Sequence, residues 1–390
     1  MKKEYDLLII GAGINGASIA RDASLRGLSV CIIEKNKIAS GASSNSSKLA
    51  HGGLRYLEHF EFSMVKKTLK ERDILLETAP KYVKPLEFIY PVYTFSKRPF
   101  WKIKIGMKVY SFLSKQSKLP NYKILSPELI SSICPQIKTK KLVGGASYFD
   151  GQLDDKEMVF ANINCAKNNK AIIHEYSEVL EFIKENKKIK GISMLKNNKK
   201  ETIYAKCIIN ATGAWANTIA KLDSKKTANL VSPTKGVHIV LPDIGLKKAL
   251  ILETPQDKRI FFLIPWKNQT LVGTTDTEFN NHPDDMSATK EDFRYLLKAT
   301  NYYLKNHIFT YNDIIDSFVG LRPLEATEKK ASDKSRDFSL IQSKSGLIHL
   351  FGGKYTSYRL MAELAVDKAI KHINPTQKLN QCITDKIELN

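Results

Sequence analysis

Cysteine is scarce in this sequence, and its cysteines show no spacing that builds a disulfide framework or a zinc site. The 390 residues contain five, an odd number, and no two follow the C-x-x-C pattern. Their positions are Cys31, Cys134, Cys165, Cys207 and Cys382. Disulfide scaffolds and zinc sites depend on paired or regularly spaced cysteines. We therefore expect reduced thiols, a cytoplasmic protein and no metal centre.

A long hydrophobic run is also missing. A membrane-spanning helix needs about 18 or more consecutive apolar residues, and no segment of the sequence approaches that length. Lys2 and Lys3 precede an apolar run at residues 7–10, but a glycine follows at once, so the run is too short for the core of a signal peptide. We expect neither a transmembrane helix nor a secretory signal.

Arginine is rare although the chain is strongly basic. The chain has 61 Lys and Arg residues against 40 Asp and Glu residues, which gives a formal net charge of +21, and only ten of the cations are arginine. A positive field attracts phosphorylated substrates, acidic lipid surfaces or nucleic acid, whereas compositional drift towards Lys, Asn and Ile accounts for it more simply. The sequence has no RGG segment and no basic block mixed with stacking aromatics, so we expect no nucleic-acid partner.

Residues 5–34 predict a strand–helix–strand unit that binds a dinucleotide. Apolar runs at 5–10 and 28–33 have the composition of buried parallel strands, and the small-residue segment 17–26 between them is typical of a closely packed helix. Residues 11–16, G-A-G-I-N-G, join the first strand to the helix, and an acid follows the second strand. Strand, glycine turn, helix and terminal acid together form the dinucleotide fingerprint.

Each position of the fingerprint has a physical role. Gly11 permits the tight turn, Gly13 lets the backbone approach the pyrophosphate, and Gly16 lets helix and strand pack closely. Asn15 belongs to the same turn, and Glu34 stands where its carboxylate accepts hydrogen bonds from both ribose hydroxyls of an adenosine. NAD and FAD share this fingerprint, so the choice between them depends on the residues that follow.

Residues 43–58, SSNSSKLAHGGLRYLE, combine a hydroxyl-rich loop with a glycine pair and a charged cluster. At this point the chain resembles the FAD-dependent glycerol-3-phosphate dehydrogenases, within the wider superfamily of D-amino-acid-oxidase-like flavoproteins, from residue 5 to about residue 372. Further matching motifs are NATGAW at 210–215, IPW at 264–266, GTTD at 273–276, GLRPL at 320–324 and FGGK at 351–354. The resemblance implies FAD as the cofactor.

The resemblance also assigns contacts to the flavin dinucleotide. In the hydroxyl-rich loop and the segment after it, the residues implied to bind the cofactor are Ser43, Ser44, Ser47, Leu49 and Gly53. Taken alone, a serine-rich segment is equally consistent with a solvated loop. Val179 would offer its backbone to the adenine, although a strand valine is usually a core residue. Thr212 and Gly213 would turn beneath the dinucleotide.

A second glycine pair, at 352–353, precedes a predicted helix at 356–370. Free N–H groups and the positive end of the helix dipole meet at such a start, and the resemblance places Gly353 and Lys354 against the N1–C2=O edge of the flavin. Negative charge appears at that edge on reduction, so a positive potential there favours hydride acceptance. An ordinary left-handed turn before a helix is the alternative.

The resemblance further implies the oxidation of sn-glycerol 3-phosphate to dihydroxyacetone phosphate by hydride transfer to flavin N5, with electrons passed to a membrane quinone. Such a reaction needs a base for the hydroxyl proton and cations for the phosphate. His51 is the candidate base, and Arg322 and Lys354 are candidates to polarise the alkoxide. The candidate substrate-binding residues are Arg55, Tyr56 and Arg336. An oxidase that uses oxygen and a flavoprotein without turnover are the alternatives.

Residues 97–118 surround apolar side chains, Trp101 among them, with seven cations. A helix in this segment is either a core helix of a second domain or an interfacial anchor on anionic lipid. An enzyme that reduces a lipid quinone must reach the membrane surface. The anchor therefore predicts peripheral attachment to the cytoplasmic face of the inner membrane.

The order of predicted elements indicates an α/β fold with an α+β second domain. A Rossmann-like FAD-binding domain is interleaved with an antiparallel-sheet substrate domain. Their segments are 1–80, 142–222 and 315–375 for the first and 81–141 and 223–314 for the second. Residues 376–390 are expected to form a tail outside the folded part. Many members of the resembling family carry a further C-terminal helical domain, and we expect it to be absent because the sequence stops soon after the last predicted helix.

Overall fold

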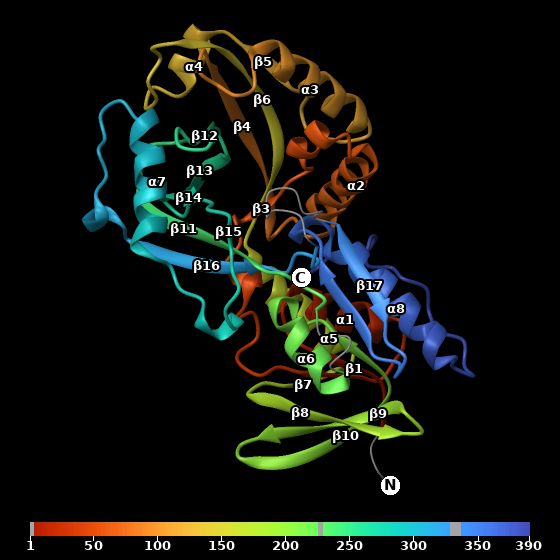
Figure 1. Ribbon diagram of the computed structural model, residues 1–390. Coiled ribbons are helices and arrows are strands. Elements are labelled where there is room, and N and C mark those ends of the chain that lie inside the picture. Colours follow the sequence, from red (N-terminus) through yellow and green to blue (C-terminus); the bar gives the residue numbers. More distant parts are fainter. Residues whose placement is uncertain (1–3, 225–228, 328–336) are drawn as a thin grey trace.

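The computed structural model describes residues 4–224, 229–327 and 337–390, and two β-sheets organise them. Figure 1 shows one sheet in the lower part of the view and the other in the upper part, with helices packed on both. The chain passes from one sheet to the other several times, so neither sheet is formed by one continuous segment.

The first sheet is built on parallel strands. Its main path runs through β17 (Phe338–Gln342), β18 (Ile348–Gly352), β10 (Lys199–Asn210), β1 (Glu4–Ile10), β2 (Val30–Ile33) and β7 (Ile172–His174). Every neighbouring pair on this path is parallel except β17 and β18. A hairpin of β8 (Ser177–Glu185) and β9 (Lys188–Lys196) continues antiparallel from β10.

Alternation along β1 gives this sheet two buried faces. Leu7 and Ile9 belong to one core with residues of α1 (Ile14–Leu25), α5 (Asp155–Asn168) and α8 (Tyr358–Ile373). Leu8 and Ile10 belong to another core with residues of the β8–β9 hairpin and of α6 (Ala216–Asp223). Successive side chains of a strand point to opposite faces, and a strand covered on both faces is apolar throughout.

The second sheet is mostly antiparallel. Its main path runs through β15 (Thr277–Glu278), β11 (Thr234–Pro242), β14 (Gln269–Gly273), β13 (Ile260–Trp266), β12 (Ala249–Glu253), β4 (Val83–Tyr93), β6 (Leu142–Leu153) and β3 (Leu49–Ala50). In addition, β16 (Asp316–Arg322) pairs with β11, and β5 (Lys123–Leu125) pairs with β6. The pair of β12 and β4 is parallel.

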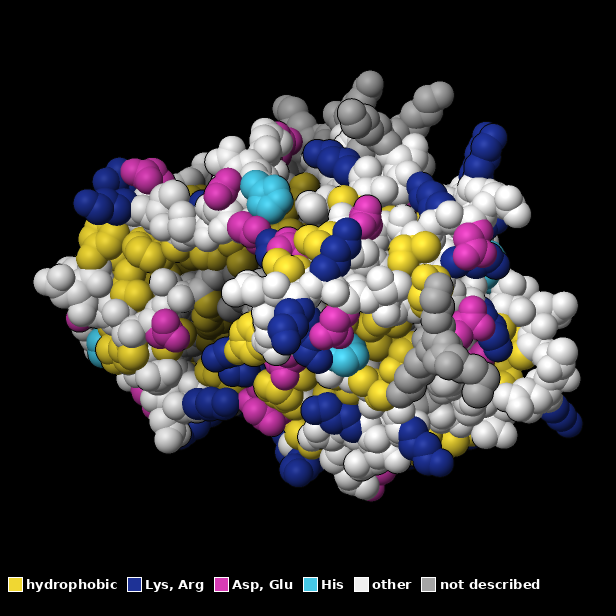
Figure 2. Space-filling model, turned by 90° about the horizontal axis from the view of Figure 1, so that it is seen from below, with side chains coloured by type: hydrophobic (Ala, Val, Ile, Leu, Met, Phe, Trp, Pro, Cys, Tyr) yellow, Lys and Arg dark blue, Asp and Glu magenta, His cyan; other side chains and the backbone are white. Residues whose placement is uncertain are grey.

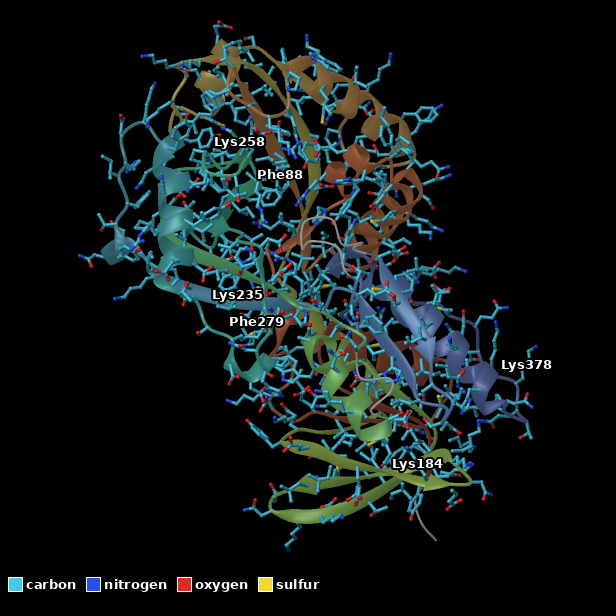
Figure 3. All side chains as sticks on the ribbon, viewed as in Figure 1. Phe88, Lys184, Lys235, Lys258, Phe279 and Lys378 are labelled. Carbon is cyan, nitrogen blue, oxygen red and sulfur yellow. The ribbon has the colours of Figure 1, made fainter. Side chains whose placement is uncertain are left out.

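Helices cover both faces of the second sheet. Residues of α4 (Pro127–Ile133) and α7 (Lys290–Tyr303) share a core with one face, and residues of α2 (Phe62–Thr78) and α3 (Phe100–Leu113) share a core with the other. Phe88, labelled in Figure 3, lies in the second of these cores and stacks on Tyr148 with 5.5 Å between ring centroids. The predicted α/β fold class, with a mostly antiparallel second sheet, is confirmed.

Three strands of the second sheet, β3, β6 and β16, lie in the segments 1–80, 142–222 and 315–375, which were expected to form the FAD-binding domain. β6 pairs with β4 along almost its whole length, and β16 pairs with β11 over all seven of its residues. Both strands belong to the second sheet because these antiparallel neighbours supply their backbone hydrogen bonds. The assignment of the two sheets to a FAD-binding and a substrate domain stays a prediction.

The prediction that residues 376–390 lie outside the folded part is wrong. Leu389 is 1% exposed, and its N–H donates to the carbonyl oxygen of Thr78 at 2.6 Å. Thr384 is also buried, and its hydroxyl oxygen lies 3.3 Å from a guanidinium nitrogen of Arg359. The segment therefore packs against α2 and α8. Its short and mostly polar sequence carries no periodic pattern that would have indicated this packing.

The surface is basic without a single cationic face in view. Figure 2 shows Lys and Arg side chains interspersed with acidic ones on the side of the molecule that it presents.

In the ranges given above, no helix combines the length and the apolar character that a membrane crossing requires. All five cysteines are free thiols.

Candidate active site

A cavity of about 770 Å³ is lined by residues of both sheets and lies at the carboxyl ends of four parallel strands. The turn after β1, the residue after β2, the segment after β10 and the glycine pair at the end of β18 all line it. Residues of β11 and β16 line it from the second sheet. Open α/β sheets bind ligands in the crevice beyond the carboxyl ends of their strands, and the volume suits a cofactor with a small substrate.

The turn from β1 into α1 brings three backbone segments unusually close together. Gly11 has φ +100°, and a Cβ there would lie 2.9 Å from the carbonyl oxygen of Ala211. A Cβ on Gly16 would lie 1.9 Å from the carbonyl oxygen of Gly11, so only glycine permits this packing. α1 begins after Gly13 with no acid in its first turn, and the positive end of its dipole is therefore available to an anion in the cavity.

Glu34 follows β2 and lines the same cavity. Its Oε2 accepts a hydrogen bond from the N–H of Ala12 at 2.8 Å, and its Oε1 accepts one from the N–H of Asn36 at 2.8 Å. Two backbone donors thus fix the plane of the carboxylate. Because each carboxylate oxygen has two lone pairs, the group can also accept from the hydroxyls of a ribose.

The hydroxyl-rich loop is held from behind by a buried ion pair. Lys48 Nζ donates to Asp155 Oδ1 and to the carbonyl oxygen of Ser44, both at 2.6 Å, and Asp155 is the first residue of α5. On the other side, Ser43 Oγ accepts from the N–H of Ile14 at 2.9 Å, at the start of α1. The loop is therefore fixed between the starts of two helices. Sequence reasoning missed Lys48 and Asp155, because only folding brings them together.

A buried histidine, also missed by the sequence analysis, faces this loop. His238 lies on β11, its Nε2 is 2.8 Å from Ser47 Oγ, and its ring stacks on Phe318 with 4.9 Å between centroids. Burial lowers the pKa of His238 well below its usual value, and the charges of Arg322 and Lys48 lower it further. The ring is therefore neutral at physiological pH. In the sequence it stands in an apolar strand, which is the pattern of an ordinary core residue.

Arg322 ends β16 and is held by the G-T-T-D segment that follows β13 and β14. Its Nη1 is 3.1 Å from Asp276 Oδ1, and its Nη2 donates to Thr274 Oγ1 at 2.9 Å. These contacts fix the orientation of a planar guanidinium group that lines the cavity. Asp276 is a further residue that was not predicted individually, although its motif was recognised as a match.

Two loops meet beside the glycine pair that ends β18. Tyr56 belongs to the short helix η2 (Leu54–His59), and Lys354 Nζ lies 3.5 Å from the centroid of the Tyr56 ring, a cation–π contact. The Thr356 hydroxyl donates to the carbonyl oxygen of His51 at 3.2 Å. The candidate base and the candidate cation therefore stand on loops that are bonded to each other.

Most of the predicted site residues line this one cavity. They are Gly11, Gly13, Asn15, Glu34, Ser43, Ser47, Leu49, His51, Arg55, Tyr56, Val179, Thr212, Gly213, Arg322, Gly353 and Lys354. Gly16, Ser44 and Gly53 are not among its lining residues and shape the wall behind it, as the Ser44 hydroxyl does by donating to the carbonyl oxygen of Ala39. Arg336 lies outside the described residues. The individual roles of all these residues stay predictions.

The arrangement fits a flavin dinucleotide by its chemistry. Three strand spacings of about 4.8 Å separate β2 from β18, so Glu34 and Gly353 are about 14 Å apart along the sheet edge. The helix start and the hydroxyl-rich loop line the cavity with them, as an extended diphosphate with a ribose at one end requires. Among the described residues, no three His, Cys, Asp or Glu side chains are grouped so as to hold a metal ion.

Comparison with known proteins places this geometry in a family. Residues 6–367 match the family model described as FAD dependent oxidoreductase. The chain is 40% identical over 384 residues to a glycerol-3-phosphate dehydrogenase of Synechocystis sp., covering 93% of this chain and 69% of that protein. It spans about two thirds of the length of the curated relatives that it matches first.

Solved structures show the same fold. The glycerol-3-phosphate dehydrogenase of Bacillus halodurans, complexed with FAD, superposes with a TM-score of 0.81 at 32% identity, covering 99% of this chain and 68% of that one. The L-alpha-glycerophosphate oxidase of Mycoplasma pneumoniae, with FAD bound, superposes with a TM-score of 0.76 at 19% identity, covering 100% and 99% of the two chains. The second likeness extends to the fold alone.

Replacing Glu34 is expected to weaken FAD binding. Glu34→Ala loses a charge-assisted acceptor for the ribose hydroxyls, which is worth about 1.5–3 kcal/mol or roughly 10- to 100-fold in Kd. Fluorescence titration of the apoprotein with FAD measures this change. Glu185→Ala, which removes an exposed carboxylate at the end of β8, is the matched control. An unchanged Kd in Glu34→Ala would contradict the assignment.

Proposed function

The chain belongs to the FAD-dependent oxidoreductases, and to the glycerol-3-phosphate dehydrogenases within them, and from that premise we propose that it oxidises sn-glycerol 3-phosphate to dihydroxyacetone phosphate. FAD is the cofactor, and when bound it supplies the acceptor for a hydride. The observation that carries the proposal is that His51, Arg322 and Lys354 line the same cavity as the dinucleotide turn.

We assign binding of the substrate phosphate to the short helix η2. Arg55 presents a guanidinium group, which matches two phosphate oxygens at once. Tyr56 is kept at the cavity by its ring contact with Lys354, and its hydroxyl is the neighbouring donor. Arg336, which the sequence resemblance assigns to the same task, remains part of the proposal although it lies outside the described residues.

A base must take the proton of the substrate hydroxyl while the hydride leaves the carbon that carries this hydroxyl. We assign this task to His51, whose loop is fixed by Thr356 and which lines the cavity. His238 is the weaker candidate, because burial holds its pKa well below the usual value and a group with a low pKa is a poor proton acceptor. Arg322 and Lys354 stabilise the negative charge that develops on the substrate oxygen.

The outer face of α3 supports contact with an anionic membrane surface. Trp101, Ile105 and Phe112 are 64%, 57% and 76% exposed, whereas other apolar residues of the same helix are buried against the second sheet. Lys104 and Lys108 are exposed beside them. Aromatic and cationic side chains together favour the membrane interface. The buried face of α3 fits the first alternative predicted for this segment, a core helix, and the exposed face supports the second, contact with anionic lipid.

This surface supports a membrane quinone as the acceptor of the electrons. We assign the role to a membrane quinone, and the protein to the cytoplasmic face of the inner membrane, because an enzyme that lies on the bilayer can reach an acceptor dissolved in it. Oxygen is the competing acceptor, and the product of its reduction distinguishes it from a quinone. An enzyme that reduces oxygen forms peroxide at the rate of turnover, whereas one that reduces a quinone does not.

Under anaerobic conditions, glycerol 3-phosphate is expected to bleach the flavin absorbance of the holoprotein. Glycerol lacks the phosphate on which binding depends and should leave the absorbance unchanged, as should an amino acid. In Arg322→Ala, FAD is retained and the bleaching rate falls about 10²- to 10³-fold, because a cation at the developing charge is lost. Arg294→Ala, an exposed arginine of α7, is the matched control.

Two outcomes of this experiment contradict the proposal. One is that the wild-type protein binds FAD but glycerol 3-phosphate does not bleach its flavin absorbance. The other is a wild-type rate in Arg322→Ala, which would remove that residue from the site. Reoxidation of the bleached protein then distinguishes a quinone analogue from oxygen as the faster acceptor.

Removing the exposed aromatic side chains of α3 is expected to reduce binding to vesicles that contain phosphatidylglycerol. Each buried aromatic contributes about 1.5–3 kcal/mol, so the double variant Trp101→Ser with Phe112→Ser should lose at least tenfold in the fraction that sediments with vesicles. Ile308→Ser, which changes an apolar residue that is 85% exposed outside α3, is the control. Equal sedimentation of the double variant and the wild type would refute the proposed contact.

A further inference from the structure

A buried ion pair behind the cavity has no part in the functions assigned so far. Arg72 of α2 and Asp150 of β6 are each 1% exposed, and Arg72 Nη1 lies 2.9 Å from Asp150 Oδ1. Neither residue lines the cavity. A buried charge costs several kcal/mol unless its hydrogen bonds are all made, and an apolar pair of similar volume often stabilises a fold equally well. A specific task in the site therefore explains this ion pair better than a contribution to the stability of the fold does.

One oxygen atom of Asp150 holds the backbone next to His51. Oδ1 accepts hydrogen bonds from the N–H of Gly52 at 3.0 Å, from Arg72 Nη1 at 2.9 Å and from the hydroxyl of Tyr110 at 3.0 Å. Gly52 directly follows His51. A Cβ on Gly52 would lie 2.2 Å from the Tyr110 hydroxyl, so the loop backbone rests directly on this cluster.

The rest of the cluster is rigid. The guanidinium group of Arg72 also donates to Asp73 Oδ1, at 2.9 and 2.8 Å, to Ser117 Oγ at 2.9 Å and to the carbonyl oxygen of Phe149 at 3.3 Å. All five of its N–H groups therefore have acceptors on α2, on β6 or after α3. Asp150 is thus held by a side chain whose own N–H groups are all hydrogen-bonded.

The other side of the same loop is anchored as well. Thr356 is 1% exposed, and its hydroxyl donates to the carbonyl oxygen of His51. Thr356 stands two residues after Lys354 in the chain. The backbone of residues 51 and 52 is thus bonded on one side to the loop that carries Lys354 and on the other to Asp150. These two bonds fix the position of His51 relative to Lys354.

We propose that Asp150 is a positioning residue of the reaction, which acts through the Gly52 N–H to hold His51 in register with Lys354; this inference rests on the function proposed above. A displacement of about 1 Å at a reacting group costs about 100-fold in rate. Loss of the Asp150 carboxylate therefore slows the chemical step and leaves FAD binding intact, because the dinucleotide is held by other residues.

Three variants test this proposal on the holoprotein. Asp150→Ala removes the acceptor, and the limiting rate of anaerobic flavin reduction by glycerol 3-phosphate falls about 30- to 100-fold, with the Kd of FAD unchanged. Asp150→Asn keeps an oxygen that can accept the same three bonds, so its rate stays within about fivefold of the wild type. Tyr110→Phe removes one donor and leaves the Gly52 bond, with an equally small effect.

Glu71→Gln is the matched control. Glu71 neighbours Arg72 on α2, is 2% exposed and forms a buried pair with Arg359 at 2.7 Å. It reports what neutralising the carboxylate of another buried pair on this helix does. Amide hydrogen exchange of the peptide spanning 49–57 adds a readout that needs no activity: exchange at Gly52 rises in Asp150→Ala and stays slow in Asp150→Asn and Glu71→Gln.

Each result decides the proposal. It is overturned if Asp150→Ala reduces its flavin as fast as Glu71→Gln, or if Asp150→Asn is as slow as Asp150→Ala. Should Asp150→Ala fail to fold, Asp150→Val takes its place, because it removes the same acceptor, leaves a smaller void and is expected to show the same loss of rate and the same rise in exchange at Gly52. A wild-type protein that glycerol 3-phosphate does not reduce refutes the proposed function, while the exchange pattern continues to test the positioning role separately.

Discussion

The contact on which the rest of the site depends is the approach of backbone to backbone where β1 turns into α1. The carbonyl oxygen of Gly11 leaves no space for a side chain at position 16, and the carbonyl oxygen of Ala211 leaves none at position 11. Strand and helix are therefore close enough for the start of α1 to line the cavity. A diphosphate can then be bound by N–H groups and the helix dipole rather than by cationic side chains.

The second sheet completes the site because two of its strands line the cavity that lies at the carboxyl ends of the first sheet's strands. Arg322 of β16 and His238 of β11 line one wall of the cavity, and the parallel sheet forms the other wall. Polar groups behind the wall fix the loops: Lys48 with Asp155 holds the hydroxyl-rich loop, and Arg72 with Asp150 holds the backbone at Gly52. Buried ion pairs that do not line the cavity thus fix the loops that carry candidate site residues.

The sequence allowed the dinucleotide turn to be predicted in detail because every part of it is local. Gly11, Gly13, Gly16 and Glu34 lie within one strand–helix–strand unit, and their spacing alone predicts their geometry. The motif resemblance added His51, Arg322 and Lys354, whose meeting depends on folding. His238, Asp150 and Asp155 escaped prediction since each looks like an ordinary core or strand residue until a distant partner is known. The packing of residues 376–390 was not predicted either, because their short and mostly polar sequence carries no periodic pattern.

The most direct measurement is a crystal structure of the reduced holoprotein with glycerol 3-phosphate bound, since the reduced flavin cannot accept a second hydride. We predict the diphosphate at the start of α1, the flavin ring beside Gly353 and Lys354, and the substrate hydroxyl within hydrogen-bond distance of His51. A flavin ring at the Glu34 end of the cavity, or a substrate phosphate remote from Arg55 and Tyr56, would contradict this arrangement.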